Sequence, residues 1–293
     1  MTNNIEKVRR SGDENFKYTL LIPTWNLLEY LKLCIRSIQQ NSHYLPQIII
    51  IVNEGNDGTI EWIKSQKGID YVHAARNIGI CYALNACRSM IASEYVVYAN
   101  DDMYFLPDWD KVLFDEIDKI GHKQFMLSAT MIEPSGNNAC GIVRDFGTNP
   151  DNFQEEALLS SYKSLYRNDW SGSCWPPSVL HIDCWDLVGG MSIEFSPGMF
   201  SDPDLCRKLW EIGVRIFKGK GDSLVYHFGC KSTKRIKKNK GSKTYTLKWG
   251  TSASTFMNKQ LLRGQDAVPE LSYNENSRLV KFKQFIKRIK SCF

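Results

Sequence analysis

A repeated order of apolar segment, polar loop and helical segment is the feature that most constrains the fold of this chain. The pattern occurs four times, and its apolar segments are residues 18–22, 47–52, 69–74 and 95–99. Continuous apolar runs of this length predict strands that are buried on both faces. Strands that alternate with helices lie parallel in one sheet, because the helices cross over between them. We therefore expect an α/β fold with a mostly parallel central sheet flanked by helices.

A polar loop follows each predicted strand, and the carboxyl ends of parallel strands meet at one ligand-binding edge of the sheet. The loops are Pro23 to Asn26, Asn53 to Thr59, Arg76 to Gly79 and Asn100 to Asp102. Asp101 and Asp102 repel each other unless a cation or a hydrogen-bond donor compensates them. Carboxylate oxygens favour Mg²⁺ or Mn²⁺, which commonly bind phosphate as well. The pair therefore predicts a metal–diphosphate site, and a simple polar turn is the alternative.

The second half of the chain is less regular. Helices are predicted at 109–120, 202–212 and 245–262, and strands at 125–131, 214–217 and 224–228. Residues 133–177 are rich in Gly, Asn, Ser and Pro, which predicts mostly loop. Residues 1–16 are expected to be a disordered lead-in.

Composition places the chain among soluble globular proteins, with 43% hydrophobic and 24% charged residues. No apolar run approaches the length of a membrane span, and Met1 to Lys17 contains no apolar signal-peptide core. The nine cysteines include no CxxC pair, which argues against a disulfide scaffold or a zinc ribbon. We therefore expect a cytoplasmic protein.

Two C-terminal segments hold much of the positive charge. Lys231 to Lys243 contains seven basic residues, Arg278 to Lys290 contains six, and neither contains an acid. Without these thirteen charges the net charge of +5 becomes −8. This distribution argues against a nucleic-acid partner and favours local contact with phosphates or anionic lipid. The first segment is either a solvated loop, or a mobile lid over diphosphate or a contact for an acceptor's phosphate.

The second basic segment predicts an amphipathic C-terminal helix. Its apolar residues fall on one side of a helix and are Leu279, Phe282, Phe285, Ile286, Ile289 and Phe293. This composition is typical of a helix that lies on an anionic membrane surface. The alternative is a helix that packs on the body of the protein. The first reading predicts peripheral attachment at the inner face of a membrane.

Several ordered motifs in residues 18–230 resemble those of the family 2 glycosyltransferases, which have the GT-A fold with a Rossmann-like sheet. The motifs are Ile22 to Asn26, Val52 to Thr59, Arg76 to Gly79, Asn100 to Asp102, Ser173 to Gly190, Phe200 to Cys206 and Val225 to His227. Val52 to Thr59 is similar to the family's Asp-rich loop, with one residue fewer. Asn100 to Asp102 stands in the position of the family's metal motif.

The resemblance implies roles for individual residues. Its donor-binding residues correspond to Pro23, Thr24, Trp25, Glu54, Arg76, Asn77, Gly79, Asn100 and Asp101. Thr24 and Glu54 would contact the nucleotide base, and Asp101 the ribose or the metal. Asp102 would be the main ligand of Mn²⁺ or Mg²⁺ and His227 the second, and the metal would neutralise the departing diphosphate. Asp202 would be the general base that takes the acceptor's proton.

The resemblance also implies a domain plan and a reaction. Residues 1–263 would form a single GT-A domain, with 18–121 as the nucleotide-sugar half and 122–263 as the acceptor half. Residues 264–293 would be a polar linker and the C-terminal helix. The enzyme would move a sugar, with inversion, from a nucleoside diphosphate sugar to a hydroxyl. The acceptor would be a glycan or a lipid-linked glycan of a surface polysaccharide.

Departures from the family pattern leave alternatives open. Asn100 stands where an acid is common, and Ser201 precedes Asp202 where the family has Glu. A non-catalytic nucleotide-sugar-binding protein is therefore a second hypothesis. A sugar-nucleotide nucleotidyltransferase is a third, although residues 23–26 contain no glycine of the kind its first loop needs.

Individual residues also have structural alternatives. Asp202 could act only as a helix N-cap, and His227 could be structural. Asp204 competes with Asp202 as the base, but a capping or packing role is expected for it.

Overall fold

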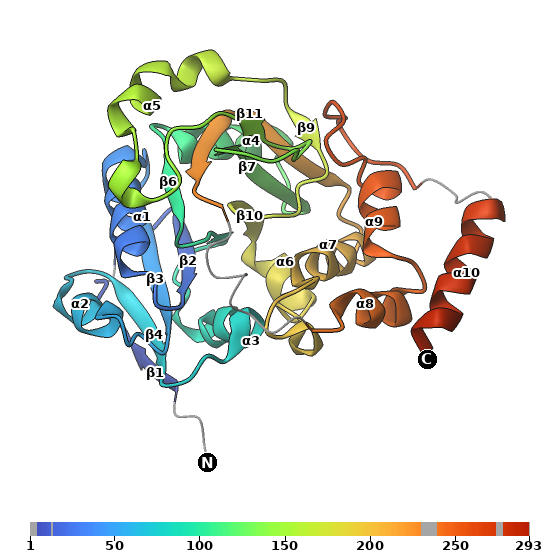
Figure 1. Cartoon of the computed structure of the whole chain (residues 1–293), viewed down its shortest axis with the longest axis horizontal. Helices are drawn as coiled ribbons and strands as arrows, with labels where there is room; N and C mark the ends of the chain where they lie inside the picture. The colour runs from blue at the N-terminus through green and yellow to red at the C-terminus, as the bar shows by residue number, and fades with distance from the viewer. Residues whose placement is uncertain (1–4, 13, 230–238, 274–277, 293) are drawn as a thin grey trace.

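The fold is taken from a computed structural model that describes residues 5–12, 14–229, 239–273 and 278–292 (Figure 1). Most of the basic segment Lys231 to Lys243 lies outside these residues. The choice between a lid and a solvated loop therefore stays untested.

The strands form one mixed sheet, which has eleven strands within the described residues. Their order is β1-β4-β3-β2-β5-β10-β7-β11-β6, with β8 beside β7 and β9 beside β11. The strands are β1 (Ile5–Val8), β2 (Tyr18–Thr24), β3 (Pro46–Asn53), β4 (Asp70–Ala74), β5 (Tyr95–Tyr98), β6 (Met103–Phe105), β7 (Phe125–Glu133), β8 (Ile142–Val143), β9 (Trp170–Ser171), β10 (Ser178–His181) and β11 (Ile216–His227). The α/β fold class is confirmed.

The parallel part of the sheet is the part that the repeated pattern predicted. Strands β4, β3, β2 and β5 pair in parallel, in that order. Strand β10 then pairs antiparallel with both β5 and β7, and β7 pairs in parallel with β11. Thus β10 joins the predicted parallel half to a second, mixed half.

Helices cover both faces of the sheet (Figure 1). They are α1 (Leu28–Asn41), α2 (Thr59–Ser65), α3 (Gly79–Ala86), α4 (Trp109–Ile120), α5 (Glu155–Ser161), α6 (Ile182–Leu187), α7 (Ser201–Glu211), α8 (Gly241–Trp249), α9 (Ala253–Thr255) and α10 (Arg278–Cys292). Successive strand residues alternate between two cores. Leu21 and Ile49 pack with residues of α3 and α7, whereas Leu20 and Ile50 pack with residues of α1 and α4. Burial of each such aliphatic side chain stabilises the folded state by roughly 1.5–3 kcal/mol relative to leaving it exposed to water.

The expectation of a disordered lead-in is wrong for its described part. Strand β1 pairs antiparallel with β4, and the backbone N–H groups of Arg10 and Ser11 donate to the Asp70 carboxylate at 2.6 and 2.7 Å. Backbone pairing holds the mostly exposed side chains of β1 at the sheet edge. No apolar pattern marks this strand, so the sequence could not reveal it.

Three further expectations need correction. The strands predicted at 214–217 and 224–228 form one strand, β11, whose register against β7 shifts between Lys220 and Leu224. The predicted loop 133–177 contains α5, β8 and β9. The helix predicted at 245–262 is divided at Gly250, which has a left-handed φ of 66° and ends α8. Such a φ is readily adopted by glycine and ends a helix.

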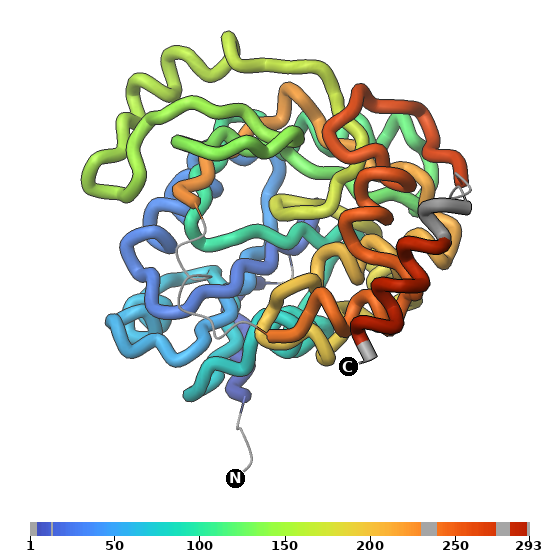
Figure 2. Tube along the Cα trace, turned by 45° about the vertical axis from the view of Figure 1, so that its right-hand side comes forward, coloured from blue at the N-terminus to red at the C-terminus, as the bar shows by residue number. Residues whose placement is uncertain are grey.

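The segment expected to be a linker is attached to the body in its described part. Gly264 donates to the carbonyl of Ser171 at 2.9 Å, and Leu271 donates to that of Arg215 at 2.9 Å. Leu271 is buried. Helix α10 then lies beside α8 (Figure 2).

Candidate active site

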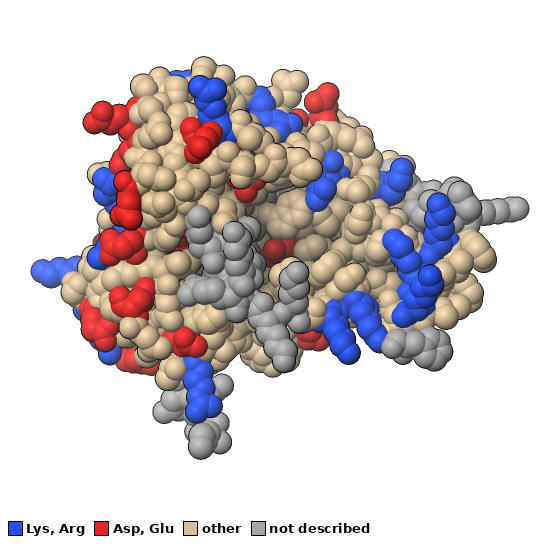
Figure 3. Space-filling model, viewed as in Figure 1, with Lys and Arg blue, Asp and Glu red and all other residues tan. Residues whose placement is uncertain are grey.

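A cleft of about 800 Å³ opens at the carboxyl edge of the parallel strands. The space-filling view shows this hollow with acidic side chains inside it (Figure 3). Every residue predicted for the site lines the cleft except Glu54 and Arg76. The loops after β2, β3, β4 and β5 thus converge, as their positions at the ends of parallel strands require.

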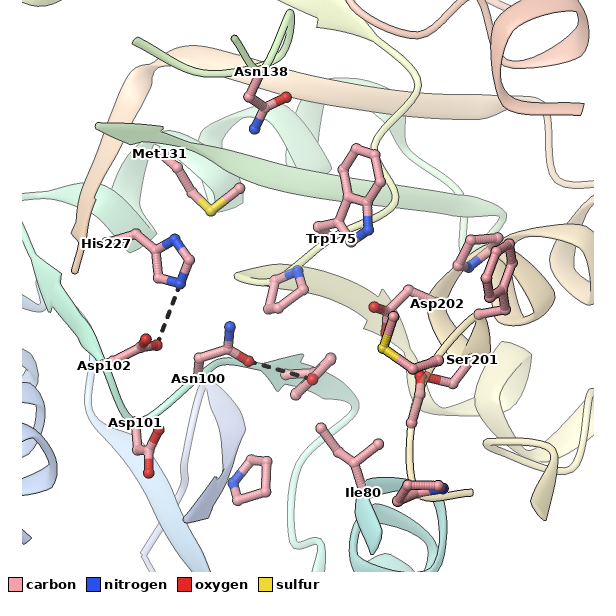
Figure 4. A pocket seen from close by; sticks show the side chains of 18 of the residues that line it. Ile80, Asn100, Asp101, Asp102, Met131, Asn138, Trp175, Ser201, Asp202 and His227 are labelled. Carbon is pink, nitrogen blue, oxygen red and sulfur yellow. Dashed lines mark hydrogen bonds and ion pairs between the residues drawn. The ribbon is translucent and has the colours of Figure 1, made fainter. Parts of the chain in front are cut away.

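Asp102 and His227 form one side of the cleft (Figure 4). His227 ends β11, and β6 begins one residue after Asp102. Because β6 and β11 pair antiparallel with His227 opposite Met103, the two side chains meet. His227 Nε2 lies 3.3 Å from Asp102 Oδ1, and both side chains are almost completely buried. The register of one strand pair therefore assembles the predicted metal ligands.

Glu133 is a functional candidate that the sequence analysis missed. It ends β7, which runs parallel to β11, and its Oε1 lies 2.9 Å from His227 Nδ1. The imidazole is thus held between two carboxylates. A carboxylate on the second ring nitrogen fixes the orientation of a metal-binding histidine. The sequence signal for Glu133 was its position close to the end of a predicted strand. It was missed because that strand was expected to end at residue 131, two residues earlier.

These side chains fit a hard divalent cation. A carboxylate oxygen and an imidazole nitrogen face the same space, a donor set that suits Mn²⁺ and also accommodates Mg²⁺. Within the described ranges, no group of three or more His, Cys, Asp or Glu side chains converges into a closed ligand set. Two protein ligands leave the other positions to phosphate and water oxygens, as is usual for Mg²⁺.

The loops after β2 and β3 brace each other. Glu54 Oε2 accepts hydrogen bonds from Trp25 Nε1 at 2.8 Å and from Asn26 Nδ2 at 3.2 Å. Trp25 lines the cleft, so Glu54 supports a wall residue from behind. A contact of Glu54 with a nucleotide base stays a prediction. Arg76 is exposed and lies outside the cleft lining.

The start of α3 forms another part of the wall. Asn77 Oδ1 accepts from the backbone N–H of Gly79 at 2.8 Å, and Asn53 Oδ1 accepts from that of Ile78 at 3.0 Å. The N–H of Ile80 donates to the carbonyl of Pro197 at 3.0 Å. Gly79 has a φ of 75°, and a Cβ here would collide with Ser196 Oγ and lie 2.8 Å from Pro197 Cα. Only glycine fits this junction without strain.

Asp202 faces Asp102 and His227 from the opposite side of the cleft (Figure 4). It lies in the first turn of α7 and is partly exposed. Phe200 occupies the N-cap position, so the alternative of Asp202 as an N-cap is wrong. Desolvation raises the pKa of the Asp202 carboxyl to about 7. A carboxyl with such a pKa is suited to general base chemistry near neutral pH.

Asp204 has the packing role expected for it. It is buried, and its Oδ1 accepts from Trp249 Nε1 at 2.8 Å and lies 2.9 Å from Lys248 Nζ. These contacts of Oδ1 join α7 to α8, and Asp204 lies outside the cleft lining.

A further wall comes from the second half of the chain. Trp175, Asn138 and Arg263 line the cleft, and the Arg263 guanidinium lies over the Trp175 ring, 5.0 Å from its centroid. Trp175 belongs to the segment 133–177 that was expected to be mostly loop. Its place in the cleft is compatible with stacking on a sugar, while Arg263 was not identified from the sequence.

The sheet order and the cleft at its carboxyl edge define a GT-A fold. Solved structures of this fold are similar along most of the chain. TarS 1-349 of S. aureus, in complex with UDP-GlcNAc, is 10% identical with a TM-score of 0.56 over 93% of this chain and 71% of that one. Mannosyltransferase PcManGT from Pyrobaculum calidifontis, in complex with GDP-Man and Mn²⁺, is 13% identical with a TM-score of 0.52 over 89% and 68%.

A family match covers most of the first half of the chain. Residues 19–161 match the family model described as Glycosyl transferase family 2. A curated relative, Uncharacterized protein y4gI of Sinorhizobium fredii (strain NBRC 101917 / NGR234), is 25% identical over 209 residues, or 67% of this chain. The chain spans only 23% of the length of that relative.

Proposed function

We propose that this protein is an inverting, metal-dependent glycosyltransferase that moves a sugar from a nucleoside diphosphate sugar to a hydroxyl acceptor. The observation that carries the proposal is the position of Asp202 opposite the Asp102–His227 pair in one cleft. A base on one side and a diphosphate-binding metal on the other are what a direct, inverting displacement needs. The similar TarS and PcManGT structures contain UDP-GlcNAc and GDP-Man, which supports a donor of this class.

Each role in the proposal belongs to a described side chain. Asp102 and His227 would hold Mn²⁺ or Mg²⁺, and the bound metal would stabilise the negative charge of the leaving diphosphate. Glu133 orients His227, and Trp25, Asn77 and the start of α3 shape the donor wall. Asp202 takes the proton from the attacking hydroxyl.

The acceptor occupies the wall formed by Trp175 and Arg263 in this proposal. An aromatic ring stacks on sugar faces, and a guanidinium pairs with phosphate or carboxylate. We therefore propose as acceptor a glycan or lipid-linked glycan of surface polysaccharide synthesis, at the cytoplasmic face of a membrane. Such an acceptor offers sugar faces to Trp175, and a phosphate or carboxylate on it would pair with Arg263. The domain plan belongs to the proposal too, with residues 18–121 serving the donor and 122–263 the acceptor.

Calorimetric titration with UDP, GDP, CDP and dTDP, with and without Mn²⁺, tests the donor site. One nucleotide is expected to bind only with Mn²⁺, and Asp102→Ala is expected to weaken that binding at least tenfold. Asp118→Ala, at an exposed position of α4, is the matched control and should bind normally. The proposal fails if no nucleotide binds with metal present. Binding without transfer or hydrolysis of the corresponding sugar nucleotide would favour a non-catalytic binding protein.

A further inference from the structure

Helix α10 packs on the body through its polar side. Gln284 is buried, its Oε1 accepts from the backbone N–H of Ser252 at 2.8 Å, and its Nε2 donates to Thr255 Oγ1 at 2.6 Å. The helix thus packs on the body, which is one of the two alternatives that the sequence left open. The contact is made by an amide that anchors the helix next to α9.

The apolar side of α10 is therefore exposed. Phe282 and Phe285 are 60% and 61% exposed, and Ile286 and Ile289 are 37% and 45% exposed. Their spacing of three and four residues places them on one face of the helix. Large apolar side chains grouped in this way on a surface mark an interaction site.

The charge of α10 indicates what this face contacts. Lys283, Lys287, Arg288 and Lys290 are exposed along the helix, whose sequence contains no acid. Basic side chains gather over α10 in the space-filling view (Figure 3). Two copies of this face would bring like charges together, which opposes self-association. Anionic phosphates complement the positive charge of α10.

A membrane-spanning role does not explain the helix. Among the helices of the described segments, none is both long enough and apolar enough to cross a bilayer. A helix with an apolar face and flanking lysines is instead suited to lie in the plane of the lipid headgroups.

We infer that α10 holds the protein on an anionic lipid surface, with Phe282, Phe285, Ile286 and Ile289 inserted at the acyl boundary and the lysines on lipid phosphates. Because α10 is anchored by Gln284, the face is presented without unfolding any other element. The inference stands on α10 alone and does not depend on sugar transfer.

Co-sedimentation of the full chain with vesicles tests the inference. The wild-type protein is expected to bind vesicles of 70% phosphatidylcholine and 30% phosphatidylglycerol, and not vesicles of phosphatidylcholine alone. Phe282→Ser with Phe285→Ser should lower the affinity roughly tenfold or more, since two aromatic rings that insert into the lipid are lost. The matched control, Leu187→Ser with Ile193→Ser, removes apolar side chains that are exposed elsewhere and should leave binding unchanged.

A charge series tests the electrostatic part. Lys287→Glu with Lys290→Glu should abolish binding to the anionic vesicles, whereas Lys64→Glu with Lys67→Glu, on the far-off exposed α2 region, should not. Asp202→Asn should bind vesicles like the wild type. Vesicle binding is thus tested independently of the proposed sugar transfer. Equal binding to neutral and anionic vesicles, or no binding to either, would overturn the inference. So would a wild-type dimer in light scattering that the double Phe variant converts to monomer.

Discussion

Asp202 and Asp204 lie two residues apart in α7 but face different surroundings. Asp202 lies in the cleft without the packing contacts that surround its neighbour, whereas Asp204 is tied to Trp249 and Lys248. Residues two apart on a helix point in directions about 200° apart, which follows from 3.6 residues per turn. One carboxylate can therefore serve the cleft while the other joins two helices.

Asp202→Asn is expected to lower the transfer kcat by about 10²- to 10⁴-fold, because the acceptor hydroxyl loses its base. Metal-dependent nucleotide binding should stay within a factor of about two. Asp204→Asn should instead lower the thermal midpoint, since it weakens buried contacts that link α7 to α8. Steady-state kinetics and thermal melts on both variants separate the two roles; a D202N enzyme of normal kcat would remove Asp202 as the base.

The raised pKa of Asp202 predicts two opposite pH dependences. Activity should rise with pH and level off above about 7, where the carboxylate is free to accept a proton. Stability should fall over the same range, because the unfolded chain loses this proton near its ordinary pKa of 3.8 while the folded chain keeps it to about 7. Asp202→Asn should therefore stabilise the protein more at pH 8 than at pH 4, as measured by urea unfolding.

Glu133 is predicted to act on the metal through His227. Glu133→Ala should weaken Mn²⁺ binding roughly 10- to 100-fold, since the imidazole loses the partner that orients it. Glu133→Gln, which still accepts a hydrogen bond, should recover part of the affinity. Electron paramagnetic resonance of free Mn²⁺ measures this without turnover, and Glu156→Ala, an exposed change, is the control. Unaltered Mn²⁺ affinity in the alanine variant would mean that Glu133 has no positioning role.

At the scale of elements, the cleft depends on how helix starts and strand ends are joined. Helix α3 begins at Gly79. The backbone N–H of the next residue, Ile80, donates a hydrogen bond to the carbonyl of Pro197, which lies in the segment that leads into α7. This contact links the cleft wall at the start of α3 to the segment that leads to Asp202. A change at the start of α3 is therefore expected to affect donor and acceptor sides together.

Gly79→Ala is predicted to destabilise the protein by about 2–4 kcal/mol, from the left-handed φ and the collision with Ser196 and Pro197. Gly68→Ala is the matched control, because Gly68 has a similar φ of 70° but no atom within 4 Å of the point that a Cβ would occupy. Gly68→Ala should lower the free energy of unfolding by only about 1–2 kcal/mol. Chemical denaturation of both variants gives the difference, and equal losses would show that the close contact is unimportant.

At the scale of the whole molecule, the two halves that we propose for donor and acceptor share one core. The same apolar cluster contains Leu21 and Ile49 of the parallel strands together with Leu205 of α7 and Phe256 after α9. This cluster therefore draws side chains from both halves. The two halves are thus expected to fold as one unit.

Urea unfolding should therefore show a single transition, with circular dichroism and tryptophan fluorescence coinciding. The nucleotide that binds with Mn²⁺ should stabilise the whole unit by about 2.7 kcal/mol at a concentration of 100 times its Kd. UDP, GDP, CDP or dTDP that fails to bind in calorimetry serves as the control. Two separated transitions, with only one moved by ligand, would contradict a shared core.

The sequence by itself determined the parallel half of the fold and most of the cleft lining at the carboxyl edge of these strands. The apolar runs before Pro23, Asn53 and Asn100 predicted strands, and the convergence of their loops follows from parallel pairing alone. Local periodicity and local turn chemistry are sufficient for such features, because they involve residues close together in the chain.

The tertiary structure alone decided the features that join distant segments. The pairing of β11 with β6 and β7 brings His227 between Asp102 and Glu133. Strand β1 is held by backbone hydrogen bonds to β4. The hydrogen bonds of Gln284 turn one side of α10 toward the body and leave its apolar side exposed. Strand register and helix docking are fixed by the total of many long-range contacts, and no short stretch of sequence contains that total.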